Sequence, residues 1–248
     1  MSQLRDKDNG CEWDKEQTFK SIAPFTIEEA YEVADAIERE DALDLKEELG
    51  DLLLQVVFLS QIAKEEKLFS FDDVAKTISE KLIRRHPFVF SDKKNHSSED
   101  QVNQWEKIKQ DERSKKDKKG VLEGIAKNLP SLKRSQKIQK RASSVGFDWS
   151  DTKGVFEKIK EELKELEEAI ESNEKESIQE EIGDLYMIMT NLSEKLGIDS
   201  EVALYRSNVK FEKRFNFIEK ELQKDDVQVN EVDSEQLNML WDESKKLS

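Results

Sequence analysis

The sequence is poor in the residues that break helices. Its 248 residues include only 8 glycines and 3 prolines, whereas 39% are Asp, Glu, Lys or Arg. Scarce turn formers and abundant helix formers predict a fold in which helices dominate. Apolar residues make up only 35% of the chain, but they cluster at helical spacing. Such clustering supplies a core and argues against global disorder.

Other scarcities disfavour whole classes of function. The formal net charge of −15 argues against a general nucleic-acid binder, although a nucleotide remains a compatible substrate if cations lie between the acids and its phosphates. Cys11 is the single cysteine and cannot form an internal disulfide, which indicates a reducing compartment. Residues 1–20 contain no apolar signal core, and the apolar stretch 52–59 is too short to span a bilayer. We therefore expect a cytoplasmic location and no membrane partner.

Apolar spacing predicts two groups of three helices, separated by a charged connector. The predicted domains are residues 1–92, the connector 93–130 with one helix near Val102–Arg113, and residues 131–248. Thr26 is the predicted N-cap of the first helix. The six ranges are Ile27–Arg39, Ala42–Lys64, Phe71–Arg85, Val155–Glu171, Ser177–Leu196 and Ser200–Leu222. The middle of the second, 52–59, is apolar nearly all round, so we expect it to be buried on several sides.

Both groups of helices carry the pattern Glu-Glu-x-x-Glu followed by Glu-x-x-Asp. Each member of the second set lies 133 positions after its counterpart, which predicts an internal duplication. The first quartet is Glu29, Glu32, Glu48 and Asp51, and the second quartet is Glu162, Glu165, Glu181 and Asp184.

This spacing favours a metal site. Residues three apart share one helix face, so two antiparallel helices bring two acid pairs face to face. Four carboxylates without counter-charges repel one another, and a hard cation such as Mg²⁺ removes that repulsion. Softer metals are disfavoured because neither quartet contains His or Cys. The alternative for any single pair in so acidic a chain is a solvated helix face.

Basic and aromatic residues follow each quartet. Lys81 and Arg85 in the first copy match Lys210 and Arg214 in the second, 129 positions later. Each pair lies on one helix face and can hold phosphate oxygens, or it can form ordinary surface salt bridges. Three tryptophans could stack on a base or pack in a core: Trp13, Trp149 and Trp241.

Two glycines, Gly50 and Gly183, each lie one residue before an Asp of a quartet. They either allow close approach of a helix or ligand or only accommodate packing.

The chain resembles the MazG nucleoside triphosphate pyrophosphohydrolases. The resemblance covers nearly the whole chain, in order, and rests on both quartets together with three flanking strings: Cys11–Thr18, Ile83–Pro87 and Val145–Trp149. Two positions depart from the family pattern, Glu12 in place of a common Pro and Phe88 in place of a common His. Both lie in the first copy, and neither quartet departs from the pattern.

The resemblance implies an all-α fold of tandem duplicated domains whose helix bundles are completed by homodimerisation. It implies Mg²⁺-dependent hydrolysis of ribo- and deoxyribonucleoside triphosphates between the α and β phosphates, with a broad substrate range and a role in nucleotide-pool cleaning. It also implies that the second copy is active. Glu162, Glu165, Glu181 and Asp184 then match the metal ligands, Lys210 and Arg214 the phosphate-contacting cations, and Trp241 a late tryptophan linked to activity.

Two alternatives remain at this stage. One is a relative of narrow specificity that cleaves dUTP or phosphoribosyl-ATP. The other is a helical interaction module that binds a partner and has lost catalysis, so that the acidic residues of the quartets are retained without a catalytic function. The residues themselves indicate a carboxylate, metal and phosphate site, whereas the choice of the bond that is cleaved comes from the resemblance.

Overall fold

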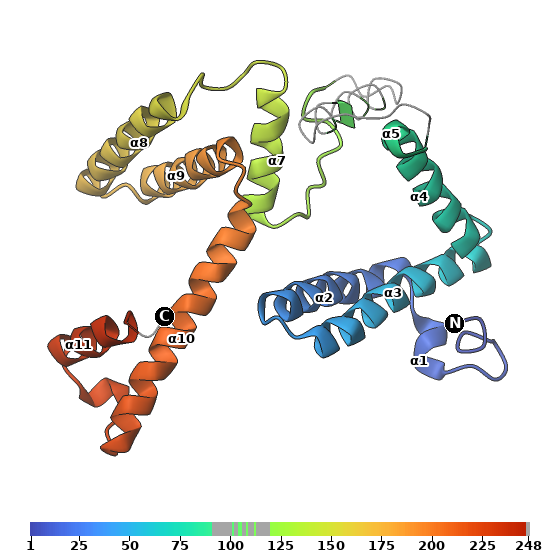
Figure 1. The fold of residues 1–248 in the computed structure, drawn as a ribbon, viewed down its shortest axis with the longest axis horizontal. Helices are drawn as coiled ribbons and strands as arrows, with labels where there is room; N and C mark the ends of the chain where they lie inside the picture. The colour runs from blue at the N-terminus through green and yellow to red at the C-terminus, as the bar shows by residue number, and fades with distance from the viewer. Residues whose placement is uncertain (91–100, 102–103, 106–107, 109–111, 113–119, 247–248) are drawn as a thin grey trace. The chain divides into compact units, whose positions relative to one another are not determined.

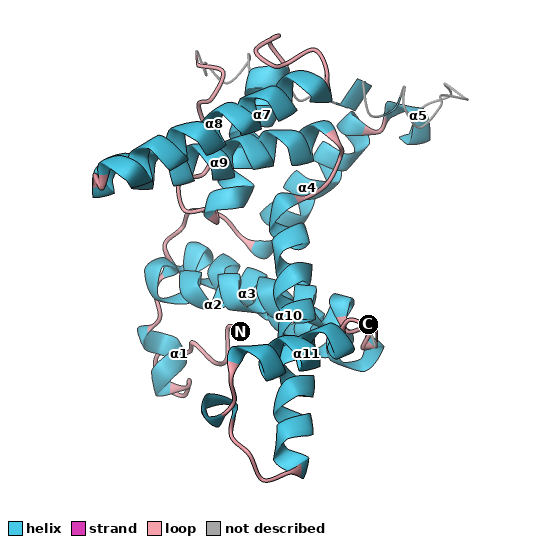
Figure 2. Ribbon diagram, turned by 90° about the vertical axis from the view of Figure 1, so that its left-hand side faces the viewer, coloured by secondary structure: helices cyan, strands magenta, loops and turns pink. Residues whose placement is uncertain are grey.

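The computed structural model describes residues 1–90, 101, 104–105, 108, 112 and 120–246. All regular structure in these residues is helical, which confirms the all-α prediction (Figures 1 and 2). The chain divides into two compact units, Met1–Glu112 and Arg113–Ser248. Each unit contains one copy of the duplicated pattern.

The first unit is built around a hairpin of two long helices. Its helices are α1 (Glu12–Glu16), α2 (Phe19–Glu38), α3 (Ala42–Glu65), α4 (Phe71–Arg85) and α5 (Pro87–Phe90). Helices α2 and α3 pack along each other, and their core contains Ile22, Phe58 and Ile62. Phe19 and Leu59 pack against this core. The hairpin places the two acid pairs of the first quartet on facing helices.

The second unit repeats the hairpin and adds helices to it. Its helices are α7 (Ser131–Ser143), α8 (Thr152–Ser172), α9 (Lys175–Lys195), α10 (Ser200–Lys224), the short 3₁₀ helix η1 (Val229–Glu231) and α11 (Ser234–Ser244). Helices α8 and α9 pair around Val155, Ile188 and Leu192. Helix α7 packs against α9, and α11 packs against α10 (Figure 1). Sequence periodicity did not predict α1, α7 or α11.

The duplication extends to the residues that begin the helices. Thr18 and Asp151 cap α2 and α8, and both side chains accept a hydrogen bond from the backbone N–H three residues on. Ser70 and Asp199 cap α4 and α10 in the same manner. Capping of this kind satisfies N–H groups that have no partner within the helix. These pairs keep the offsets of 133 and 129 found in the quartets and the basic residues.

One predicted boundary was wrong. Thr26 does not cap the first long helix, because that helix begins eight residues earlier, after Thr18, and continues through Pro24. Thr18 forms a capping box with Ser21, and this fixes the true start. The hydroxyl of Thr26 instead donates to the carbonyl of Ile22, one turn back. The helix predicted over residues 102–113 lies largely outside the described residues.

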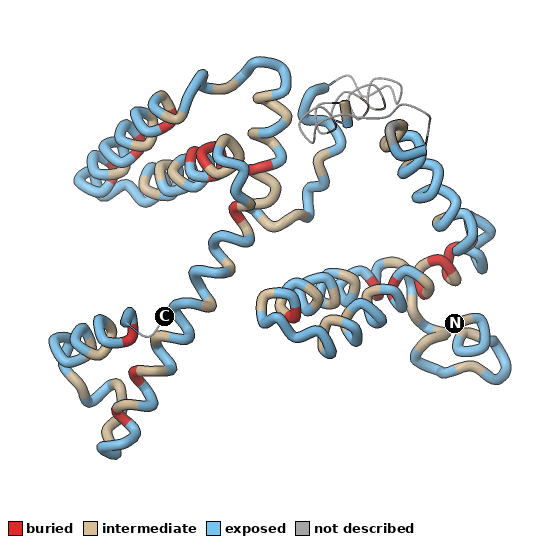
Figure 3. The backbone as a smooth tube through the Cα atoms, in the orientation of Figure 1, coloured by how far each residue is buried: buried red, intermediate tan, exposed pale blue. Residues whose placement is uncertain are grey.

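The predicted burial of residues 52–59 on several sides is only partly reached within the single chain. Leu53, Leu54 and Val56 are exposed on α3, at 55%, 42% and 36% (Figure 3). Helix α2 covers one side of α3, and α4 contacts only its end. One partner helix cannot cover a helix that is apolar nearly all round. No helix among the described residues is both long enough and apolar enough to cross a membrane.

Candidate metal centre

The hairpin of α8 and α9 brings the second quartet together. Glu162 and Glu165 on α8 and Glu181 on α9 each offer one carboxylate oxygen, and these oxygens lie within 4.8 Å of one another. Asp184 lies one turn after Glu181 and lines the same cavity as Glu162. Carboxylates of three members, two on α8 and one on α9, thus converge across this hairpin, and Asp184 is outside that group of oxygens.

The first quartet converges in the same way in the other unit. Oxygens of Glu29, Glu48 and Asp51 lie within 4.8 Å of one another. Glu32 lies close enough for its charge to raise the pKa of both Glu29 and Glu48, although burial of these two carboxyls has the larger effect. Gln55 donates to Glu29, with 3.2 Å between Nε2 and Oε1.

Charge is poorly compensated in the second quartet. Glu162 is only 5% exposed, and its Oε2 atom is buried without a hydrogen-bond partner. Burial, together with the charges of Glu165 and Glu162, raises the pKa of Glu181. Lys158 is the counter-charge, with its Nζ 2.7 Å from Glu162 and 4.0 Å from Glu165. Hydrogen bonds to Glu161 and Glu162 raise the pKa of Lys158.

These residues fit a hard divalent cation. The donor set consists of carboxylate oxygens alone, which Mg²⁺ prefers. The unpartnered oxygen of Glu162 is a buried acceptor that a cation satisfies, and such an atom is costly if nothing pairs with it. Burial and, after it, the charges of neighbouring carboxylates raise the pKa of Glu181, and a bound cation relieves the repulsion among these carboxylates.

The two copies differ around their quartets. At the offset of 133, Phe25 corresponds to Lys158, Phe58 to Asn191 and Ile62 to Lys195. In the first unit, Trp13 packs edge-on against Phe25 and Phe58, at ring-centroid distances of 5.9 and 6.4 Å. The first copy therefore has an aromatic cluster where the second copy has polar and charged side chains.

Two of those polar side chains, Asn191 and Lys195, bind one loop, between α7 and α8. The carboxylate of Asp148 accepts from Lys195 at 2.8 Å, from Asn191 at 3.1 Å and from Ser143 at 3.0 Å. Burial raises the pKa of Asp148, but these hydrogen bonds lower it by more, so the pKa lies below its ordinary value of 3.8. Lys195 also donates to the carbonyl of Trp149 at 2.7 Å. The loop is thus tied to α9.

A cavity of about 880 Å³ adjoins the second quartet. Its walls come from α7, the loop that follows it, α8, α9 and residues 121–122. Glu162, Asp184 and Lys158 lie at its border, and Trp149 is among its lining residues. A cavity of this size is within the usual range for ligand sites, about 300–1,000 Å³. The second copy therefore combines a carboxylate cluster with room for a ligand.

One member of the basic pair of the first copy, Arg85, is engaged by an acid. Arg85 and Arg84 both form ion pairs with Glu112, at 2.5 and 2.7 Å. The hydrogen bond from Arg85, opposed by burial and reinforced by Arg84, lowers the pKa of Glu112 to about 2. An arginine held by a carboxylate has less positive charge to offer a phosphate.

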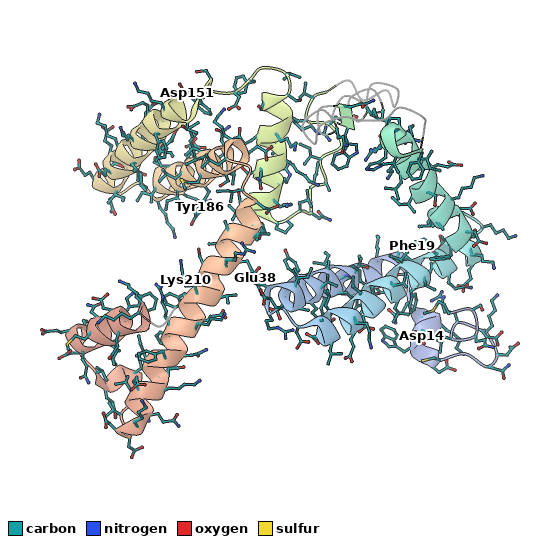
Figure 4. All side chains as sticks on the ribbon, viewed as in Figure 1. Asp14, Phe19, Glu38, Asp151, Tyr186 and Lys210 are labelled. Atoms are coloured by element: carbon teal, nitrogen blue, oxygen red, sulfur yellow. The ribbon has the colours of Figure 1, made fainter. Side chains whose placement is uncertain are left out.

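The basic pair of the second copy is not brought to the quartet within one chain. Glu181 and Asp184 lie in the first half of α9, so about 17 Å of helix separates Asp184 from its end. Helix α10 starts beyond that end and leads away from α8 and α9 (Figures 1 and 4). Arg214 lies over the ring of Trp241, 5.6 Å from its centroid, and Phe211 packs against the same ring at 5.2 Å. In the single chain, Trp241 packs against α10.

Within the described part of the single chain, no other helix approaches the two glycines near the quartets closely. A Cβ atom added at Gly50 or Gly183 would meet no described atom beyond its own helix backbone within 4 Å. Sequence reasoning also missed Lys158, Asp148, Asn191 and the cavity. A comparison of the copies residue by residue could have found Lys158 and Asn191, because each replaces a phenylalanine.

Comparison with known proteins agrees with this geometry. The model of the MazG nucleotide pyrophosphohydrolase domain matches residues 17–90 and 151–217, the two regions that contain the quartets. The chain belongs to the MazG nucleotide pyrophosphohydrolase family. Its members are enzymes, and the two matched segments show a tandem arrangement of MazG domains.

Full-length relatives of this MazG-family chain carry the same description. The nucleoside triphosphate pyrophosphohydrolase of Escherichia coli K12 is 46% identical over 250 residues, which cover 99% of this chain and 94% of the relative. The nucleoside triphosphate pyrophosphohydrolase/pyrophosphatase MazG of Thermotoga maritima is also 46% identical, over 99% of this chain and 92% of the relative. A solved MazG-related protein from Thermotoga maritima matches 43% of this chain at 23% identity, with a TM-score of 0.38, and carries no structural conclusion.

Proposed function

We propose that this chain hydrolyses nucleoside triphosphates to nucleoside monophosphates and pyrophosphate, with Mg²⁺, at the second quartet. The observation that carries the choice of site is the buried, unpartnered oxygen of Glu162, next to Glu165 and Glu181 and at the border of a cavity. Family membership and the two full-length relatives support the reaction class.

In this proposal the chain's residues position the phosphates and the cation. Glu162, Glu165, Glu181 and Asp184 hold Mg²⁺, which supplies positive charge to the phosphate oxygens and lowers the pKa of water when bound. Support comes from the hairpin of α8 and α9, in which oxygens of Glu162, Glu165 and Glu181 lie within 4.8 Å of one another, so that these three need little reorganisation. Lys158 holds Glu162 in place through its ion pair.

Product analysis tests the bond that is cleaved. With dATP and Mg²⁺, the expected products are dAMP and pyrophosphate, separated by anion exchange and counted against substrate consumed. Primary release of orthophosphate and dADP would overturn the assignment of the α phosphorus. Excess chelator is expected to abolish turnover, and undiminished turnover under chelation would overturn the metal-dependent mechanism.

The substrate range is proposed to be broad, over ribo- and deoxyribonucleotides, as expected for an enzyme that cleans the nucleotide pool. A panel of the common triphosphates together with dUTP and phosphoribosyl-ATP separates this from a narrow-specificity relative. Comparable kcat/KM values across the common triphosphates support the proposal. Turnover confined to dUTP or phosphoribosyl-ATP would replace it.

A homodimer is proposed because both hairpins expose apolar stripes at matching positions. Each stripe residue of the second copy lies 133 positions after an exposed counterpart in the first. The pairs are Ile37 and Ile170, Leu49 and Ile182, Leu53 and Tyr186, and Val56 and Met189. Apolar stripes of this extent are uncommon on monomers and favour association. Sedimentation at micromolar concentration tests the proposal, and an active monomer would contradict it.

In the proposed homodimer, the basic pair of one chain can contact the phosphates bound at the quartet of the other chain. Lys210 and Arg214 are proposed to contact the leaving pyrophosphate, yet α10 leads them away from the quartet of their own chain. We therefore propose that α10 of the other chain in the dimer brings this pair, with Trp241, to the quartet.

A cytoplasmic location, inferred from the lone Cys11, remains a prediction.

A further inference from the structure

A short turn joins α9 to α10, the helix that carries the basic pair. Gly197 lies in this turn with a φ of 70°, a left-handed conformation that favours glycine. Asp199 caps α10 by accepting from the N–H groups of Glu201 and Val202. A few residues between two helices can absorb large changes of φ and ψ, so the turn alone does not fix the angle between them. The contacts of the turn with the rest of the unit therefore decide the direction of α10.

Gln136 on α7 contacts every part of this junction. Its Nε2 donates to the carbonyl of Ile198 in the turn at 2.7 Å and to Oε2 of Glu194 in the last turn of α9 at 3.2 Å. Its Oε1 accepts from the backbone N–H of Ser200, the first residue of α10, at 3.0 Å. Gln136 and Ser200 are both buried, and a buried polar group that loses its partner is costly. These hydrogen bonds therefore hold α9, the turn and α10 to α7.

Lys133 reinforces this contact one turn earlier on α7. Its side chain forms an ion pair with Asp199. Its backbone N–H lies in the first turn of α7, where it has no acceptor within the helix, and it donates to Oε2 of Glu201 at 3.3 Å. The first turns of the two helices thus supply each other with hydrogen-bond partners, and α7 lies beside the start of α10 (Figure 1). We call the contact of Lys133 and Gln136 with residues 199–201 the α7–α10 clamp.

The corresponding residues of the first copy are arranged differently. At the offset of 133, Gln3 corresponds to Gln136, but Gln3 is exposed and lies in a turn. At the offset of 129, Phe71 corresponds to Ser200, and Phe71 is 43% exposed at the start of α4. The clamp therefore accompanies the second copy, whose basic pair is proposed to act on the phosphates.

The angle at which α10 leaves the turn determines where its basic pair lies. Arg214 follows Ser200 by 14 residues, which is about 21 Å at about 1.5 Å per residue. A tilt of about 10° at the first turn would move Arg214 by about 4 Å. Misplacement of a catalytic group by about 1 Å can lower a rate about 100-fold.

We propose that Gln136 is a positioning residue that sets the direction of α10 and thereby the place where Lys210 and Arg214 meet the phosphates. It acts through the backbone of the α9–α10 junction and contacts neither residue of the pair. This rests on the proposed function, in which the pair contacts the leaving pyrophosphate.

Distances between spin labels test the direction of α10 without any need for turnover. The labels are attached at Lys137→Cys on α7 and Glu219→Cys on α10, both exposed positions, in a Cys11→Ser background. Labelled chains are mixed with excess unlabelled chains, so that only distances within one chain are measured. Gln136→Leu, which keeps a similar volume and removes the three hydrogen bonds, should shift or broaden the distribution. Gln223→Leu, exposed near the end of α10, is the matched control and should leave it unchanged.

A double-mutant cycle separates positioning from general damage to the fold. Gln136→Leu alone should lower kcat for dATP on the order of tenfold or more, because the basic pair is misplaced. In an Arg214→Ala background, the same substitution should lower kcat less than about twofold, since the group that it misplaces is already absent. Lys133→Met, which removes the ion pair of the clamp, is a second variant that should show the same pattern with a smaller effect.

Two results would overturn the role of Gln136. One is an unchanged distance distribution in Gln136→Leu and Lys133→Met, with folding confirmed by circular dichroism. The other is an equal fold-loss of kcat in both backgrounds, since this indicates damage outside the basic pair. Failure of the proposed function has a different signature. The wild type would then release no pyrophosphate from dATP, while the distances would still change in Gln136→Leu, so the reaction would fall and the clamp would stand.

Discussion

Lys158 forms the ion pair of the buried Glu162, with 2.7 Å between Nζ and Oε1. This pair exists only in the second copy, since the corresponding residue of the first is Phe25. The lysine compensates a carboxylate that is 5% exposed and belongs to the proposed metal site. Lys158 and the proposed metal ion would therefore both neutralise negative charge in the same acidic cluster.

Replacing Lys158 by Met should destabilise the metal-free protein by about 1–3 kcal/mol, because Glu162 then remains buried without its partner. Mg²⁺ should restore more stability to this variant than to the wild type, since it supplies the missing positive charge. Thermal unfolding with and without Mg²⁺ measures both effects. Lys164→Met, which removes an exposed ion pair on the same helix, is the control. Equal Mg²⁺ shifts in all three proteins would contradict the prediction.

The two quartets should differ in their effect on turnover. Glu181→Gln is expected to lower kcat/KM for dATP about 10²-fold or more, because a preorganised charged ligand is lost. Its counterpart Glu48→Gln should change kcat/KM far less, since Trp13 and Phe25 pack beside that quartet. Circular dichroism confirms that both variants fold. Loss of activity in Glu48→Gln alone would reverse the assignment of the working site.

Mixed dimers test whether Lys210 and Arg214 act on the quartet of the other chain in the dimer. Chains with Glu181→Gln and chains with Arg214→Ala are co-expressed with different tags, and the heterodimer is purified. If α10 acts across the dimer, one intact quartet meets one intact basic pair, and about half of wild-type activity should return. If α10 acts within its own chain, neither site is complete and the heterodimer should be as inactive as either parent.

Acid should weaken the loop between α7 and α8. Asp148 has a lowered pKa in the folded protein, so its carboxylate stabilises the fold above its ordinary pKa of 3.8, and this stabilisation is lost as the pH falls through the folded value. Asp148→Asn should therefore be less stable than the wild type at pH 7, and the difference should shrink below about pH 4. Urea unfolding between pH 7 and pH 3 measures this, with the exposed Glu168→Gln as control. A difference that is constant with pH would exclude the linkage.

The amino-acid sequence was sufficient to predict the helical class and the duplication, and its spacing selected the acidic residues proposed for each quartet. These are local properties: apolar spacing sets which face of a helix is buried, and a three-residue spacing places two carboxylates on one face. Even the caps of α2 and α8 recur at the offset of the quartets. The cap predicted at Thr26 was wrong because the helix continues through Pro24 back to Phe19, where Thr18 and Ser21 form the capping box.

Only the tertiary structure decided what surrounds each quartet. Asp148 and Lys195 are 47 residues apart, and Arg85 and Glu112 are 27 apart, so no helical period relates them. Their pairing depends on how α7, α8 and α9 pack and on the position of Glu112 next to the end of α4. The exposure of Leu53 likewise depends on how many neighbours cover α3, a number that its own sequence does not contain. Distances between residues far apart in the chain follow from packing, and packing distinguishes the two copies.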